Sequence, residues 1–94
     1  MAYLISHYFE GGTQAQYDKV VAVAHPADGL PPGQQFHAAG PTDGGYLVVA
    51  VWDSKASNDA FISGTLMPAL QGTEGGFVGP PQERAAEVAN LVTS

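Results

Sequence analysis

The chain lacks cysteine and has few basic residues, and these two absences exclude several classes of function. Without cysteine among its 94 residues, it has no disulfide, no thiolate nucleophile and no cysteine-based metal site. Three basic residues stand against nine acidic ones, which gives a formal net charge of −6. They are scattered, at Lys19, Lys55 and Arg84, and form no positive patch that would attract nucleic acid or anionic lipid. We therefore expect neither a nucleic-acid partner nor a membrane partner.

Long apolar runs are missing as well. No stretch approaches the length of a membrane-spanning helix, and Met1 to His7 have neither the basic region nor the apolar length of a signal peptide. We expect one cytoplasmic domain spanning residues 1–94. Hydrophobic residues make up 45% of the chain, which is rich for a domain of this size and suggests an interface with another subunit.

The segment from Gly45 to Trp52 is the most informative one. As a strand it is apolar on both faces, so both faces of its sheet need a cover. A chain of this length buries roughly 60 to 70% of its unfolded surface, which is enough for one modest core and one cover. A second copy of the chain is the natural second cover, and the sequence therefore predicts a homodimer.

The first half of the chain predicts a strand over residues 2–9 and a helix over 14–24. Thr13 and Gln16 have the spacing of a capping box, and apolar residues recur with the helical period after them. Prolines predict a loop over residues 25–33, followed by a strand over 34–39. Asp43-Gly44 is typical of a hairpin turn, so this strand and the one at 45–52 should be antiparallel.

In the second half, Ser54 predicts the start of a helix from Lys55 to about Leu66, which Pro68 ends or kinks. A Gly- and Pro-rich loop is expected over 71–82. Residues 84–87 favour helix and 88–93 favour strand, and we interpret 83–92 as a strand because it completes a ferredoxin-like β-α-β-β-α-β pattern. The expected fold class is α+β: a four-stranded antiparallel sheet with two helices on one face, pairing into a dimeric α+β barrel.

This pattern resembles a known superfamily. The residues that carry the resemblance are HYFEGGTQAQY at 7–17, GLP at 29–31, FHAAGP at 36–41 with Gly44-Gly45, and VWDS at 51–54. On them the chain is similar to the dimeric α+β barrel proteins, which include the antibiotic-biosynthesis monooxygenases, and in particular to short actinobacterial-type members. These motifs are turns, caps and core residues, so the resemblance implies a fold more than a reaction.

One branch of that superfamily degrades haem with an Asn, a Trp and a His, the His coming from the second helix. Here the expected second helix contains no histidine, only Asn58, and Trp52 is a partial match. Haem oxygenation is therefore less expected, although a haem ligand from His7 or His37 stays open. We expect no cofactor and no metal, because two histidines without a third ligand are a weak metal signal.

Two histidines are the candidate catalytic residues. His37 lies in a predicted strand with Phe36 and Ala38 facing the other way, so it can point into the interior. There it would act as a general base or as a hydrogen-bond donor to an enol or phenol. His7 would share that interior if the register allows it. The alternative for both is a buried structural histidine, and His25 is interpreted as structural because it ends a helix.

The candidate substrate-binding residues are Trp52, Tyr46, Tyr8 and Asn58. The three aromatics can line an apolar cavity and stack on a planar ligand, although a core role is the stronger interpretation for Trp52. Asn58 stands where a bulky apolar residue is expected, which would leave space or a polar atom beneath the helix.

Two function classes stay open. The first is a cofactor-independent monooxygenase or isomerase that acts on a small aromatic or polyketide-like molecule. The second is a non-catalytic dimer, related to stress or to sequestering a small apolar ligand. Fold alone does not separate them, because function depends on the site.

Overall fold

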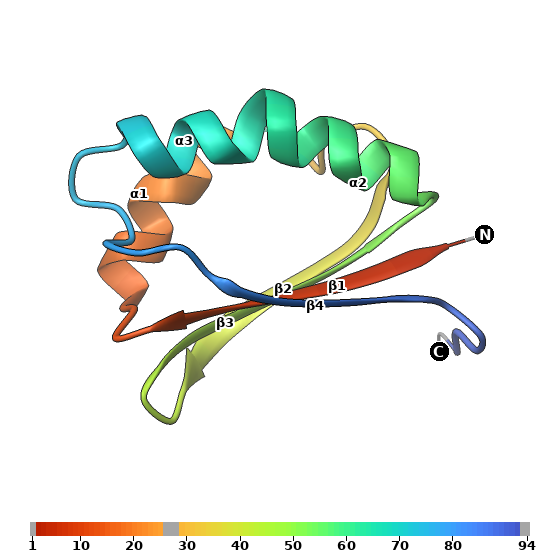
Figure 1. Ribbon diagram of the computed structural model, residues 1–94, viewed down its shortest axis with the longest axis horizontal. Coiled ribbons are helices and arrows are strands. Elements are labelled where there is room, and N and C mark those ends of the chain that lie inside the picture. Colours follow the sequence, from red (N-terminus) through yellow and green to blue (C-terminus); the bar gives the residue numbers. More distant parts are fainter. Residues whose placement is uncertain (1, 26–28, 93–94) are drawn as a thin grey trace.

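The computed structural model describes residues 2–25 and 29–92 and shows one sheet with helices on one of its faces (Figure 1). The elements are β1 (Tyr3–Glu10), α1 (Gln14–Ala24), β2 (Gln34–Thr42), β3 (Gly45–Trp52), α2 (Lys55–Phe61), the π-helical η1 (Ile62–Leu66), α3 (Met67–Gly72) and β4 (Gln82–Glu87). The strand order is β2-β3-β1-β4, and every neighbouring pair is antiparallel. This is the ferredoxin-like α+β arrangement that the sequence predicted. Pro26, in the expected loop, lies outside the described residues.

The start of α1 confirms the predicted capping box. The Thr13 hydroxyl accepts from the backbone N–H of Gln16 at 3.2 Å, and the Gln16 side chain accepts from the backbone N–H of Thr13 at 2.9 Å. Two N–H groups that a helix start leaves without intrahelical partners are thereby bonded. Val20 and Ala24 on the inner stripe of the helix are buried against the sheet.

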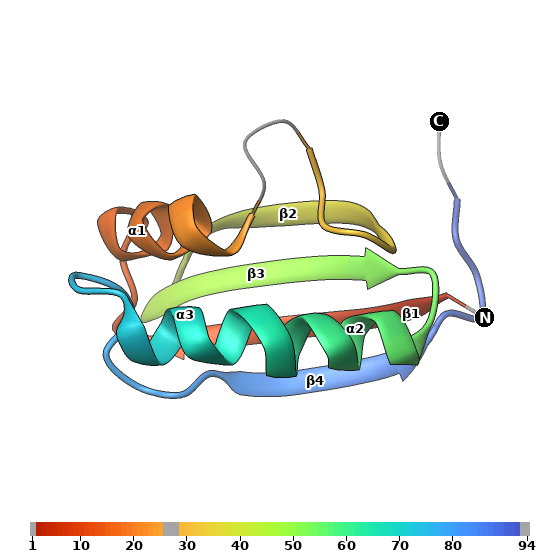
Figure 2. The ribbon, with the colours of Figure 1, turned by 90° about the horizontal axis from the view of Figure 1, so that it is seen from above.

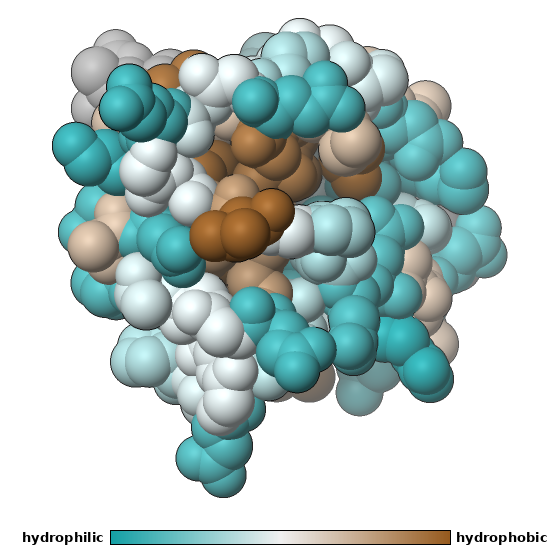
Figure 3. All heavy atoms as spheres, turned by 60° about the vertical axis from the view of Figure 1, so that its left-hand side comes forward, coloured by the Kyte–Doolittle hydropathy of each residue, from teal (hydrophilic) through white to brown (hydrophobic). Residues whose placement is uncertain are grey.

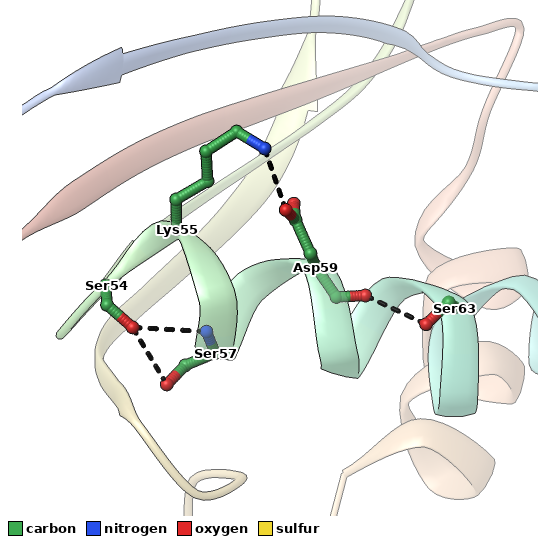
Figure 4. A network of polar contacts seen from close by, with 5 residues as sticks. All are labelled: Ser54, Lys55, Ser57, Asp59 and Ser63. Atoms are coloured by element: carbon green, nitrogen blue, oxygen red, sulfur yellow. Dashed lines mark hydrogen bonds and ion pairs between the residues drawn. The ribbon is translucent and has the colours of Figure 1, made fainter.

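The second helix begins at the predicted cap but extends further than predicted. The Ser54 hydroxyl accepts from the backbone N–H of Ser57, and Lys55 pairs with Asp59 at 2.7 Å on the outer surface (Figure 4). Viewed from above, α2, η1 and α3 run over the sheet as one rod (Figure 2).

Pro68 does not end this rod near Leu66, because a π-helical turn precedes it. The N–H of Met67 bonds to the carbonyl of Ile62, five residues back, and the rod continues to Gly72. The wider turn accommodates the proline ring, which would crowd the carbonyl of the preceding turn in a regular α-helix. Pro68 was predicted either to end or to kink the helix. The helix is distorted before Pro68 but does not end there.

The last strand lies earlier than predicted. β4 covers Gln82–Glu87, and its partners on β1 run from Tyr8 to Tyr3. Beyond Glu87 the partner strand has ended, and one further bond, from Val88 N–H to Ala2 carbonyl at 2.9 Å, closes the ladder. The prediction of a strand over 88–92 was therefore wrong, and Thr93 lies outside the described residues. Pairing with β1 has overridden the helical propensity of residues 84–87.

The two faces of the sheet differ in their cover. Alternate residues of β1 and β3 point toward the helices and form most of the core, which includes Ile5, Phe9, Tyr46, Ala50 and Trp52. The other face has no helix over it (Figure 1). By the same alternation Leu4, Phe36 and Leu47 lie on that open face, and they are 37%, 47% and 36% exposed.

Within the described residues, no helix combines the length and the apolar character needed to cross a membrane.

Candidate functional site

A cavity of about 50 Å³ lies between the sheet and the helices. Strands β1, β2 and β3 provide its floor, and α1 with the α2–η1 rod provides its walls and roof. Most of the lining side chains are apolar. The polar ones are His7, Tyr17, His25, Gln34, His37, Trp52 and Asn58. Four of the six predicted site residues, His7, His37, Trp52 and Asn58, therefore meet in one cavity.

His37 is bonded to a tyrosine that was not among the predicted site residues. Its Nε2 lies 2.5 Å from the hydroxyl of Tyr17 on α1. Burial and the nearby Tyr46 raise the pKa of Tyr17, so the phenol keeps its proton at neutral pH. A phenol donates a hydrogen bond more readily than it accepts one, so we assign the proton to Tyr17 and the lone pair to Nε2. The single N–H of a neutral His37 then resides on Nδ1.

The environment of His37 keeps its ring neutral. Burial and the neighbouring His25 lower the pKa of His37 to about 4. The His25 ring meets the His37 ring edge-on, with centroids 4.5 Å apart, and burial lowers the pKa of His25 as well. His25 was expected to be structural. Its backbone N–H bonds to Val21 as expected of a helix end, but its ring lines the cavity.

His7 shares the cavity and the helix-covered face with His37. It is 7% exposed, and its partner on β3 is Val48, whereas His37 pairs with Ala50 on the other side of that strand. The two imidazoles are thus separated by β3. The Nε2 of His7 lies 3.0 Å from the Glu83 carboxylate on β4.

Four polar atoms of this site are buried without a hydrogen-bond partner among the described residues. They are Gln34 Oε1, His37 Nδ1, Trp52 Nε1 and Asn58 Oδ1. All four side chains line the same cavity. Buried polar atoms are rarely left unpaired, since each costs about 1–3 kcal/mol, so four around one cavity call for hydrogen-bonding partners, either ordered water or a polar ligand.

Trp52 and Asn58 are among the most buried of these side chains, and each has one polar atom without a hydrogen-bond partner among the described residues. They are 1% and 2% exposed, and Phe61 packs against the Trp52 ring at 5.1 Å between centroids. Asn58 on α2 does place a polar atom beneath the helix, as the sequence suggested. Trp52 is both core and cavity wall.

The structure places Tyr46 and Tyr8 away from the cavity lining. Tyr46 is 1% exposed in the adjacent core cluster, and its hydroxyl donates to Gln14 at 2.9 Å. Tyr8 lies on the open face, and its hydroxyl donates to the carbonyl of Asp43 at 3.3 Å. Neither side chain is positioned to contact a ligand in this cavity. The alternation of residues in β1 puts Tyr8 opposite to His7.

A second, wider hollow of about 490 Å³ lies beside the turn between β1 and α1. Phe9 and Phe77 line both this hollow and the cavity, and their rings are stacked with centroids 3.8 Å apart. Figure 3 looks at the end of the molecule where α1 begins and shows apolar side chains gathered in a recess among hydrophilic ones. Gly11 and Gly12 line this hollow and form a tight turn, in which the N–H of Gly12 bonds to the carbonyl of Phe9 at 2.9 Å.

No cluster of three or more metal-binding side chains occurs within residues 2–25 and 29–92. A porphyrin does not fit the cavity either. Its volume of about 50 Å³ is well below the ~300–1,000 Å³ of ordinary ligand pockets, and the Nε2 atoms of His7 and His37 already bond to Glu83 and Tyr17. We therefore assign no step to a haem.

Tyr17, Gln34 and Glu83 are the polar residues of this site that sequence reasoning missed. Tyr17 fits the apolar helical stripe that follows the capping box, and nothing in that pattern marks its hydroxyl as functional. Gln34 and Glu83 belong to strand ends, where the side chain that each one meets depends on register. The sequence carries no signal for that register.

No protein-family model matches this chain, and no curated protein matches it in sequence. Solved structures do match its fold over almost the whole length. A putative antibiotic biosynthesis monooxygenase from Chloroflexus aurantiacus has a TM-score of 0.68 and 16% identity, over 99% of this chain and 98% of the other. A mutant of SnoaB, a cofactor-independent oxygenase from Streptomyces nogalater, has a TM-score of 0.65 and 14% identity, over 99% and 97%.

A mutant of MhuD with two manganese protoporphyrin IX molecules bound per active site has a TM-score of 0.63 and 23% identity, over the full length of both chains. At such identities the likeness shows the fold alone. The chain has the fold of the antibiotic-biosynthesis-monooxygenase-like proteins, as the resemblance in sequence implied.

Proposed function

We propose that this chain is a cofactor-independent monooxygenase or isomerase that acts on a small phenol or enol bound between the helices and the sheet. The observation that carries the proposal is the set of four unpartnered polar atoms around one mostly apolar cavity. A ligand with an apolar body and a few polar substituents would satisfy both features.

The four atoms divide into donors and acceptors. His37 Nδ1–H and Trp52 Nε1–H donate, and the carbonyl oxygens of Gln34 and Asn58 accept. A phenol or enol loses a proton to become an anion, and two buried N–H donors would stabilise the negative oxygen that forms. Because its pKa is about 4, His37 serves this reaction better as a hydrogen-bond donor than as a base at neutral pH.

The size of the cavity restricts the substrate. Its volume of about 50 Å³ is smaller than the ~150 Å³ cavity that holds one benzene ring in an engineered protein. Even one ring must therefore displace side chains of the roof, where Phe61 and Ile62 are only half-buried. We infer a single-ring substrate in preference to a polyketide-like one.

The fold neighbours support the choice of reaction. SnoaB is a cofactor-independent oxygenase, and the chain from Chloroflexus aurantiacus is described as a putative monooxygenase. In the oxygenase reaction that we propose, a CH₂ group next to the phenol or enol and one O₂ give a carbonyl and one water. An isomerase would return the proton to another carbon and consume no O₂.

Oxygen uptake tests this proposal. Purified protein is given a panel of single-ring phenols, quinols and enols, and O₂ consumption and product are measured together. We expect uptake with at least one compound, one O₂ per product, and loss of activity in His37→Ala without loss of the fold. Glu74→Gln, exposed in the loop after α3 and away from the cavity lining, is the control and should keep full activity. Unchanged turnover in His37→Ala removes His37 from the mechanism.

The second candidate is a non-catalytic dimer that binds or sequesters a small molecule. The same four unpartnered atoms favour it, since they bind a ligand whether or not a reaction follows. Binding of a panel compound with neither O₂ uptake nor isomerisation would support this candidate and exclude the enzyme.

A homodimer is part of either proposal. Leu4, Phe36 and Leu47 expose apolar area on a sheet face that no helix covers, and exposed apolar area of this kind marks an interface. Two copies packed through this face would bury it and leave both cavities on the outer, helix-covered sides.

A further inference from the structure

The proposed reaction needs a base, and His37 is a poor one. The other histidine of the cavity, His7, is paired with a residue to which nothing has yet assigned a role. Glu83 on β4 lies directly opposite His7 on β1, and the His7 Nε2 is 3.0 Å from the Glu83 carboxylate. The Glu83 side chain is 50% exposed, whereas the His7 side chain is 9% exposed. The carboxylate thus lies at the edge of the sheet and the imidazole lies in the cavity.

This contact determines which nitrogen of His7 carries the proton. An ionised carboxylate only accepts hydrogen bonds, so the Nε2 of His7 must be the donor. A neutral imidazole has one N–H, and its Nδ1 therefore keeps a free lone pair. Among the described residues, no side chain hydrogen-bonds to this Nδ1.

His37 has the opposite arrangement. Tyr17 donates to its Nε2, so its Nδ1 carries the N–H. Both rings lie on the same face of the sheet, on either side of β3. Strands separated by one other strand are roughly 10 Å apart, and the β3 partners of the two histidines, Val48 and Ala50, lie about 7 Å apart along that strand, so the two backbone positions are roughly 12 Å apart. Both histidines line the cavity, so one wall carries a nitrogen lone pair and the other an N–H donor, and a ring with a CH₂ group opposite its oxygen offers the matching groups, an acidic C–H and an acceptor oxygen.

We propose that His7 is the general base of this site and that Glu83 is its positioning residue. The Nδ1 of His7 takes a proton from the CH₂ group opposite the substrate's oxygen, and the electron pair of the broken C–H bond moves through the conjugated ring onto that oxygen, which becomes the enolate or phenolate oxygen. His37 and Trp52 donate to the oxygen that becomes negative. The imidazolium of His7 keeps its bond to Glu83, whose negative charge stabilises it. This inference rests on the proposed function.

The pairing itself is tested without any substrate. In protein labelled with ¹⁵N, long-range proton–nitrogen correlations identify the protonated nitrogen of His7, and a protected Hε2 signal reports its bond. We expect a protonated Nε2, a lone-pair Nδ1 and an Hε2 signal that disappears in Glu83→Ala. Glu87→Ala is the matched control, since Glu87 is exposed on the same strand and the same face, opposite Tyr3. A protonated Nδ1, or an Hε2 signal unaffected in Glu83→Ala, would overturn the pairing.

The role in the reaction is tested with the panel compound that the wild type turns over. We expect His7→Gln to lower kcat by about 10²- to 10⁴-fold, the usual contribution of a general base, with KM changed far less. Glu83→Gln should lower kcat by a smaller factor, Glu83→Asp should restore part of it, and Glu87→Gln should leave both constants unchanged. A change confined to KM would mean that Glu83 acts on binding and would contradict the proposal.

The two tests separate this inference from the proposed function. If the wild type is active and His7→Gln is equally active, the base is another group and the proposed function stands. If no panel compound is turned over or bound by the wild type, the proposed function fails and the assignment of His7 as a base fails with it. The correlation spectra would still decide whether Glu83 orients His7.

Discussion

Trp52 connects the stability of the chain with its candidate function. Its ring is 1% exposed, packs against Phe61 and belongs to a core cluster with Ile5 and Ala50. We predict that Trp52→Ala lowers the free energy of unfolding by about 3–5 kcal/mol, the usual range for a buried large aromatic. Urea unfolding followed by circular dichroism measures this. A loss below about 1 kcal/mol would place Trp52 outside the core.

Because His37 is buried in its neutral form, the free energy of unfolding should fall as the pH is lowered. Its pKa is lowered from 6.5 to about 4 in the folded chain. Between these values the unfolded state binds more protons than the folded state, so stability is retained above pH 6.5 and is lost as pH falls toward 4. His25, whose pKa burial also lowers, acts in the same direction.

We therefore predict that the urea midpoint falls less between pH 7 and pH 4 in His37→Gln than in the wild type. The comparison removes the contribution of the carboxylates, which both proteins share. Identical pH profiles would show that His37 is not buried in its neutral form.

At the scale of single residues, the sequence predicted the site only in part. The sequence singled out His7, His37, Trp52 and Asn58, which line the cavity, because a histidine or an asparagine in a core pattern, or the single tryptophan, is visible in the sequence itself. Glu83 and Gln34 were not, because their roles depend on which residue lies opposite, and period-two patterns do not determine register. Tyr8 was predicted to line the cavity but lies on the open face of the sheet. An aromatic residue suits either face of a strand, and the sequence does not show which face the helices cover.

Among the elements, α1 depends on its cap. The Thr13 hydroxyl and the Gln16 side chain bond to each other's backbone N–H groups. We predict that Thr13→Ala lowers the free energy of unfolding by about 1 kcal/mol, the typical cost of losing such a cap. Thr42→Ala changes an exposed threonine outside any cap and should cost less than about 0.5 kcal/mol. Equal losses in the two variants would show that the capping box adds nothing.

Element boundaries were predictable where local chemistry determines them. Thr13, Ser54 and Asp43-Gly44 mark two helix starts and a hairpin turn, and all three were read correctly from the sequence. The end of the second helix and the position of β4 were not. The end of the helix depends on a π-helical turn that accommodates Pro68. The position of β4 depends on where its partner strand β1 ends. Neither is a local property of the chain.

For the whole molecule, the open face of the sheet predicts a homodimer. Leu47 is 36% exposed on this face, on the central strand β3. We predict a dimer at micromolar concentration in sedimentation equilibrium and a monomer for Leu47→Glu, because a charge on this face would be buried without a partner. Val23→Glu replaces an apolar residue that is 62% exposed on α1 and should leave the dimer intact. A monomeric wild type would refute this assembly.

The central claim is that a small polar ligand binds between the helices and the sheet, and Trp52 offers the most direct test of it. The chain has one tryptophan, so its indole N–H gives a single, unambiguous signal in a proton–nitrogen correlation spectrum. This Nε1 is buried without a partner among the described residues. Titration with the single-ring phenols, quinols and enols should move the signal downfield and saturate for at least one compound. A folded protein whose indole signal stays fixed with every compound at millimolar concentration would contradict the account.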